Sequence, residues 1–170
     1  MKQRLLDIPF ISRTRRNHGL EHATIHLLSD AKPGRPLAGH SDAGGFWILG
    51  EVGTEELAET ATTALNRLRA GERELAVHPN CGTNFATYGI FAGLGAFTAF
   101  TGAGSRFRDK LERLPLAAVF ATMALILSQP LAFRLQREVT TSGDPGDLKL
   151  IKVTKTAIGG RTAHRVETAG

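Results

Sequence analysis

The sequence predicts an α+β protein in which a small soluble domain with a β-α-β unit carries a two-helix transmembrane hairpin and a C-terminal β-hairpin. Three observations predict this class. Residues 54–70 have an amphipathic helical pattern between two short apolar runs. Residues 85–104 and 114–133 contain no charged side chain, and about 20 residues suffice to cross a hydrocarbon core of roughly 30 Å. Apolar residues alternate with polar ones around Gly159-Gly160.

The N-terminal quarter predicts an arm, a helix, a loop and a strand. Residues 1–16 mix leucine, isoleucine and phenylalanine with basic residues, as expected of an arm at a membrane surface. Asn17 is a good N-cap for a helix that runs to about Leu28. Residues 31–45 are rich in proline, glycine and polar residues and predict turns and a loop. The apolar residues of 46–52 then predict a short strand.

A clear amphipathic helix follows Thr54, which we expect to cap it. Glu55 and Glu56 fall in its first turn, where the helix dipole favours acidic groups. Its apolar residues recur at helical spacing and are Leu57, Ala61, Ala64, Leu65 and Leu68. Gly71 fits the position after its end. We predict a second strand over Glu74–His78, which would complete the β-α-β unit.

The two uncharged runs are interpreted as transmembrane helices because each carries small residues at helical spacing. Gly89 and Gly93 lie four residues apart in the first run, and Ala117 and Ala121 do so in the second. Such residues let membrane helices approach closely. A pair of buried helices in a soluble core is the alternative. The predicted divisions are an N-terminal α+β domain over residues 1–83, the hairpin over 84–134, and a C-terminal hairpin over 135–170 that packs on the N-terminal domain.

Composition limits the partners and the compartment. The net charge is +5, but basic residues are scattered and lack interleaved aromatic residues, so we expect a lipid bilayer as partner and no nucleic acid. A single cysteine excludes an internal disulfide. The N-terminus does not resemble a cleaved signal peptide. We therefore predict an integral protein of the inner (plasma) membrane with both termini in the cytoplasm. The sequence does not indicate an oligomeric state.

Two short stretches concentrate residues that bind metals. In the first, His18, His22 and His26 follow one another at four-residue steps, which places them on one face of a helix. Glu21 completes a His-x-x-Glu-His pattern, the inverted motif of zinc hydrolases. The second stretch is His78-Pro79-Asn80-Cys81, and His-x-x-Cys is also spaced for metal ligation. Helix-face histidines and an inert buried cysteine are the alternative interpretation.

The three helical histidines cannot all bind one ion, because residues eight apart are separated by about 12 Å along a helix. In one geometry His18 and His22 are ligands and Glu21 acts on bound water as general base. In the other, His22 and His26 are ligands and Glu21 orients a ligand. His78, Cys81 or both would complete the set, and zinc is the expected ion.

Together the motifs resemble those of uncharacterised bacterial membrane proteins, described as domains of unknown function or as predicted metal-dependent enzymes. The matching segments read His-Gly-Leu-Glu-His-Ala-Thr-Ile from His18 and His-Pro-Asn-Cys-Gly-Thr-Asn-Phe from His78, just before the predicted membrane helices. The resemblance covers the two motifs and the helical hairpin, about half the chain. The resemblance implies a metal-dependent membrane protein and does not indicate a substrate.

Two functional hypotheses follow from these residues. The first is a membrane-anchored zinc-dependent hydrolase with Glu21 as general base, acting on a membrane-associated substrate. Three protein ligands and one open position would favour it. The second is a non-catalytic membrane protein in which the His/Cys cluster is structural, favoured by four protein ligands or by none.

Overall fold

The structure is a computed structural model that describes residues 5–170. The chain divides into two compact units. We call Met1–His78 together with Arg137–Gly170 the sheet unit, and Pro79–Gln136 the helical unit.

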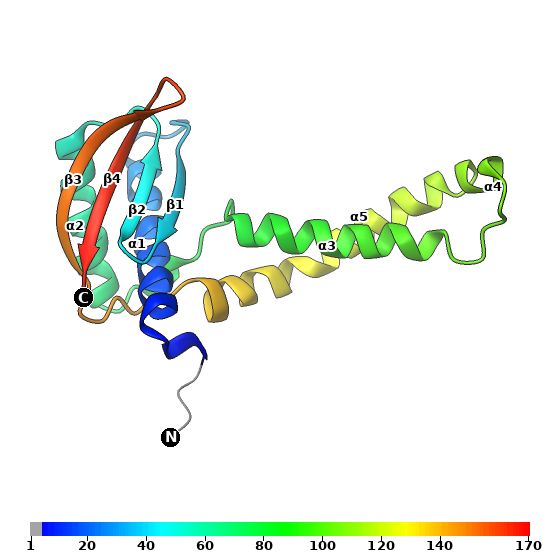
Figure 1. The fold of residues 1–170 in the computed structure, drawn as a ribbon, viewed down its shortest axis with the longest axis horizontal. Helices are drawn as coiled ribbons and strands as arrows, with labels where there is room; N and C mark the ends of the chain where they lie inside the picture. Colours follow the sequence, from blue (N-terminus) through cyan, green and yellow to red (C-terminus); the bar gives the residue numbers. More distant parts are fainter. Residues whose placement is uncertain (1–4) are drawn as a thin grey trace. The chain divides into compact units, whose positions relative to one another are not determined.

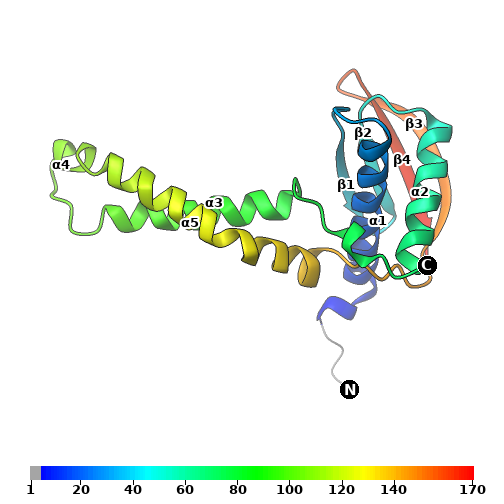
Figure 2. The same ribbon diagram turned by 180° about the vertical axis from the view of Figure 1, so that it is seen from behind.

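The sheet unit consists of one antiparallel sheet with two helices on the same face, as the two opposite views in Figures 1 and 2 show. The strand order is β1-β2-β4-β3. The strands are β1 (Ala38–Asp42), β2 (Gly45–Leu49), β3 (Lys149–Ile158) and β4 (Arg161–Ala169). The helices on the sheet are α1 (Pro9–Ala31) and α2 (Thr54–Arg69). The fold is therefore α+β, as the sequence predicts.

The core lies between this sheet and its two helices. Phe46 and Ile48 project from β2, pair in register with Val166 and His164 of β4, and are fully buried. The helices cover them with Leu20, Leu28 and the apolar face predicted for α2. Burying one such side chain contributes about 1.5–3 kcal/mol, so this layer is the main source of stability in the unit.

Helix α1 begins earlier than predicted. Pro9 occupies its first turn, where a missing N–H costs nothing, and Ile8 precedes it as N-cap. Asn17 is therefore not a cap but a fully buried residue within the helix. Its side chain donates to the carbonyl oxygen of Asp42 and accepts from the hydroxyl of Thr168. Of the predicted N-terminal arm, residues 1–4 lie outside the described residues.

The predicted β-α-β unit is wrong. Residues predicted as its second strand form the 3₁₀ helix η2 (Arg73–Ala76), while the segment predicted as a loop supplies β1. Ala38–Asp42 can pair with β2 because Gly44 and Gly45 allow a tight hairpin, in which a side chain on Gly45 would overlap the backbone of Val166. Gly53 is the N-cap of α2, and Thr54 is its first residue. The Thr54 hydroxyl is hydrogen-bonded to Nε2 of His164.

The C-terminal hairpin is present. Gly159 and Gly160 both have positive φ, +57° and +75°, as a two-residue type I′ turn requires. Strand β4 then pairs with β2, so the last strand of the chain lies inside the sheet that the N-terminal segment begins.

The helical unit contains α3 (Gly82–Ala99), the short α4 (Phe107–Leu111) and α5 (Leu114–Leu135). Helices α3 and α5 pack closely at Gly95, where an added Cβ would lie 2.6 Å from the Phe120 carbonyl oxygen and 2.8 Å from the Ala124 Cβ. A π-helical turn over Gln136–Thr140 follows α5.

One described helical segment, Phe107–Thr140, is long and apolar enough to cross a membrane. Helix α3 does not reach this standard, so the predicted pair of transmembrane helices is corrected to one candidate. The reason is composition: α3 has 18 residues, of which glycine and threonine take a large share, and glycine adds little apolar surface.

Candidate functional site

The histidines of α1 form the centre of the candidate site. His18 and His22 stand one turn apart, and their ring centroids are separated by 4.4 Å. Each offers a ring nitrogen within 4.8 Å of the other, so both nitrogens can reach one ion between them. His22 is almost completely buried and His18 is partly buried. The pair therefore lies in a setting where its electrostatic interactions are weakly screened.

Backbone carbonyls orient each of these rings. The Nδ1 of His18 lies 2.9 Å from the Thr140 oxygen, and the Nδ1 of His22 lies 2.8 Å from the Ala76 oxygen. A carbonyl oxygen can only accept, so Nδ1 carries a proton in both rings. The Nε2 atoms then carry the lone pairs that ligate metals, an arrangement typical of metal-bound histidines.

His78 extends the row of imidazoles. Its ring centroid lies 5.7 Å from that of His22 and 4.6 Å from that of His26. His26 is bonded through Nε2 to the Val77 oxygen at 2.9 Å. Burial, together with the nearby His26 and His22, lowers the pKa of His78 to about 4. His78 is therefore neutral at physiological pH, which is the form that binds metals.

Glu21 is a buried carboxylate held by strand β1. Its Oε2 accepts a hydrogen bond from the hydroxyl of Ser41. Its Oε1 occupies the space that a side chain on Gly39 would need. The spacing of the sequence motif places Glu21 next to the histidines along the chain, but the motif contains no signal for this contact with β1.

Cys81 is the N-cap of α3, three residues after His78. Its carbonyl oxygen accepts from the N–H groups of Asn84 and Phe85 at 3.0 and 3.3 Å. The partial positive charge at a helix N-terminus favours the thiolate, the form that binds metals. His18, His22 and Cys81 form a group that could hold a metal ion.

The sequence-predicted residues thus fall into distinct roles. His18 and His22 are close neighbours, and the ring of His78 lies beside those of His22 and His26 in a tilted arrangement. His26 does not belong to the three-residue group that could hold a metal. Sequence reasoning missed the groups that orient these side chains, namely Ser41 and the carbonyls of Ala76, Val77 and Thr140. A backbone carbonyl has no side-chain signature, and Ser41 stood in a segment predicted as a loop.

Fold and site together define an α+β protein with an apolar helical insertion and a histidine-rich centre. The chain belongs to the family described as Domain of unknown function (DUF6391), which matches residues 13–153 and so includes both motifs. It is similar to an uncharacterized protein of Picosynechococcus sp., with 33% identity over 138 residues. That alignment covers 75% of this chain and 65% of the relative. No solved structure matches the chain.

Proposed function

We propose that the chain is a membrane-anchored, zinc-dependent hydrolase whose metal is held by His18, His22 and Cys81. The observation that carries the proposal is the orientation of the two histidines. Each donates its Nδ1 hydrogen to a backbone carbonyl from a different segment, so each presents Nε2 as a ligand atom. Helix-face histidines that served only as surface groups would need no such fixed tautomer.

The donor set fits zinc better than a hard cation. Two imidazoles and one thiolate are borderline and soft ligands, which zinc prefers, whereas magnesium and calcium prefer oxygen. Three protein ligands leave a fourth tetrahedral position for water, which is the arrangement of catalytic zinc sites. When bound there, zinc would lower the pKa of a coordinated water toward about 7 and polarise a substrate carbonyl or phosphoryl oxygen.

Glu21 is the proposed general base. It would accept a proton from the attacking water and return it to the leaving group. The hydrogen bond from Ser41 holds its Oε2 and fixes the plane of the carboxylate. We assign Ser41 the role of a positioning residue, since its hydroxyl donates to Glu21 and it would act through that carboxylate.

Membrane attachment is proposed for the apolar helical segment Phe107–Thr140. Its side chains include Leu127 and Ile126, which are 74% and 55% exposed. Such contiguous apolar exposure is typical of a surface that faces lipid or a partner. A site attached to this helix would act on a substrate that is itself associated with the membrane.

A non-catalytic, structural metal site is the second candidate. It is favoured by His78, whose neutral ring lies beside His22 and could supply a fourth ligand. It is also favoured by Glu21, both of whose oxygens face β1. A closed site with four protein ligands would have no position for water.

Cobalt substitution distinguishes the two functions. The purified protein in detergent is stripped of metal and titrated with Co²⁺, whose absorption reports both thiolate ligation and coordination number. We expect one Co²⁺ per chain, a sulfur-to-metal charge-transfer band that Cys81→Ser removes, and a spectrum that shifts when a small anion such as azide is added. Azide can bind only where a coordination position is open.

Three variants provide the controls. Glu21→Gln should bind Co²⁺ as the wild type does, because a general base is not a ligand. His40→Ala removes an exposed β1 histidine and should change nothing. A spectrum unaffected by azide and changed by His78→Ala would establish the structural site instead. A wild-type protein that binds no Co²⁺ would exclude both functions.

A further inference from the structure

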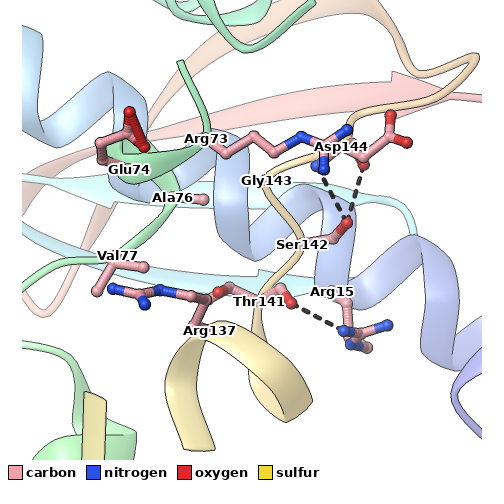
Figure 3. Close-up of a pocket in the computed structure, with 10 residues that line it drawn as sticks. All are labelled: Arg15, Arg73, Glu74, Ala76, Val77, Arg137, Thr141, Ser142, Gly143 and Asp144. Carbon is pink, nitrogen blue, oxygen red and sulfur yellow. Dashed lines mark hydrogen bonds between the residues drawn. The ribbon is translucent and has the colours of Figure 1, made fainter. Parts of the chain in front are cut away.

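A cavity of about 440 Å³ opens in the sheet unit, and three arginines line it (Figure 3). They come from three segments of the chain: Arg15 from α1, Arg73 from η2, and Arg137 from the π-helical turn. The cavity also contains the carboxylates of Glu74 and Asp144, so positive charge is in excess by three groups to two. A cavity of this size can hold a phosphate group and the moiety attached to it.

The three arginines differ in what already binds them. Arg15 donates from Nε and Nη2 to the carbonyl oxygens of Val139, Glu138 and Thr141 at 2.7 to 3.0 Å. Among residues 5–170 its Nη1 makes no hydrogen bond, and the guanidinium groups of Arg73 and Arg137 make neither a hydrogen bond nor an ion pair. N–H donors of these planar guanidinium groups are therefore available to a ligand in the cavity.

One wall of the cavity is formed by a loop that packs tightly on η2. Gly143 packs so closely on η2 that an added Cβ would lie 2.7 Å from the Arg73 Cβ and 2.9 Å from its carbonyl oxygen. Ser142 closes the same loop by donating to the Asp144 oxygen and accepting from the Asp144 N–H. The backbone of Arg73 is thus closely packed against this loop.

We infer that this cavity is a binding site for a phosphate group, bound by Arg73 and Arg137 with Arg15 as support. Arginine pairs with phosphate through two parallel N–H···O bonds, and these charge-assisted bonds are stronger than neutral ones. A phosphate group offers more oxygens than a carboxylate does, so phosphate is the better fit to a cavity that more than one guanidinium group lines. The binding requires no metal and does not depend on the proposed hydrolase.

Two sources can supply such a phosphate, a lipid headgroup and a soluble phosphate compound. Arg137 lies in the last turns of the apolar segment Phe107–Thr140. An arginine at the end of a membrane helix lies at the depth of the lipid headgroups. Ala76 lines the cavity, and its carbonyl oxygen also orients His22. Thr141 lines the cavity as well and directly follows Thr140, whose carbonyl oxygen orients His18.

The test measures binding by the full chain in the presence of EDTA. One arm titrates the protein in neutral detergent with inorganic phosphate by calorimetry. The other arm places it in nanodiscs of phosphatidylcholine with or without phosphatidic acid and counts retained lipids by native mass spectrometry. The variant is R73Q/R137Q, and the charge-matched control is K149Q/R161Q, which removes two exposed cations from the C-terminal hairpin.

We expect the cavity variant to weaken binding at least tenfold and the control to weaken it less than twofold, since a lost charge-assisted bond costs about 1.5–3 kcal/mol. Binding of inorganic phosphate would identify a soluble ligand. Retention of phosphatidic acid without phosphate binding would identify a headgroup. Equal losses in both double variants, or no binding by the wild type in either arm, would overturn the inference. Thermal unfolding of both variants checks that they fold.

Discussion

Gly19 lies against the carbonyl group of Ser142, so closely that any side chain at Gly19 would overlap the carbonyl oxygen. The Ser142 N–H donates to the carbonyl oxygen of Arg15, one helical turn earlier, at 2.9 Å. The glycine inside the His-Gly-x-Glu-His motif therefore has a physical reason. It allows the segment that carries the Thr140 carbonyl to approach α1 and to orient His18.

We predict that Gly19→Ala destabilises the protein by about 2 kcal/mol, because the added Cβ would meet a backbone carbonyl and the cost of overpacking is then near the top of its range. Overpacking costs about 1–3 kcal/mol, and the gain of about 1 kcal/mol in helix propensity only partly offsets it. Chemical unfolding followed by circular dichroism measures the change. Gly89→Ala is the matched control, because Gly89 is also within a helix and has nothing within 4 Å of its added Cβ. If Gly19→Ala is as stable as the wild type, the close approach to Ser142 is wrong.

The contact between Ser41 and Glu21 predicts energetic coupling between the two residues. Hydrogen bonds to charged groups contribute about 1.5–3 kcal/mol. A double-mutant cycle of Ser41→Ala and Glu21→Gln should therefore give a coupling free energy above about 1 kcal/mol. Metal content should be unchanged in Ser41→Ala. Additive effects of the two substitutions would show that the strand does not hold the carboxylate.

The lowered pKa of His78 predicts a specific dependence of stability on pH. Its pKa is about 4 in the folded protein and about 6.5 in an unfolded chain. Between these values the unfolded state binds more protons, so stability should fall as the pH drops from about 6.5 to about 4. After allowance for solvent screening at this half-buried position, we expect a loss of roughly 1 kcal/mol.

Urea unfolding at several pH values in EDTA measures this loss without interference from metal. His78→Gln should reduce the dependence, whereas His40→Gln, at an exposed position on β1, should retain it. A His78→Gln protein with the wild-type pH profile would contradict the assignment.

The fixed tautomers predict which helical histidines are ligands. His18→Ala and His22→Ala should each lose the metal measured by elemental analysis of the purified protein. His26→Ala should retain it, because the Nε2 of His26 is bonded to the Val77 oxygen and the residue is not in the group that could hold a metal. Loss of metal in His26→Ala with retention in His18→Ala would support the other pair, His22 with His26.

The apolar helix predicts a difference between two exposed isoleucines. Ile126 of α5 and Ile151 of β3 are 55% and 60% exposed. An arginine near the centre of a membrane helix costs about 2.5–3.5 kcal/mol of insertion free energy. Ile126→Arg should therefore increase the fraction of protein released from membranes by alkaline carbonate, and Ile151→Arg should not. Equal release of the two variants would argue against insertion of this helix.

Local sequence patterns predicted the elements whose stability is local. Helix α2 has its acidic first turn, basic last turn and regular apolar face, and the C-terminal hairpin has the two glycines that its turn requires. The β-α-β unit failed because strand pairing is decided by distant partners. β2 pairs with β4, more than a hundred residues later, and with β1, whose short polar sequence carries little strand propensity.

The candidate site was predictable in its residue types but not in its supports. Histidine spacing identified His18 and His22 because helical geometry alone brings them together. It could not identify the carbonyls of Thr140 and Ala76, since any residue type can supply a backbone oxygen. Absence of charge overestimates the apolarity of α3, because glycine and threonine dilute its apolar side chains.

The pairing of β2 with β4 limits how many times the segment between them can cross a membrane. Strand β2 precedes the helical unit and β4 follows it, and both belong to one hydrogen-bonded sheet, so the chain leaves the sheet unit at His78 and returns to it at Arg137. A sheet cannot be divided by a bilayer. Any part of the insertion that crosses a membrane must therefore cross it an even number of times, so α5 either crosses together with a second segment of the helical unit or is embedded in the membrane without crossing it. Strands β2 and β4 accordingly lie on the same side of any membrane that the insertion enters.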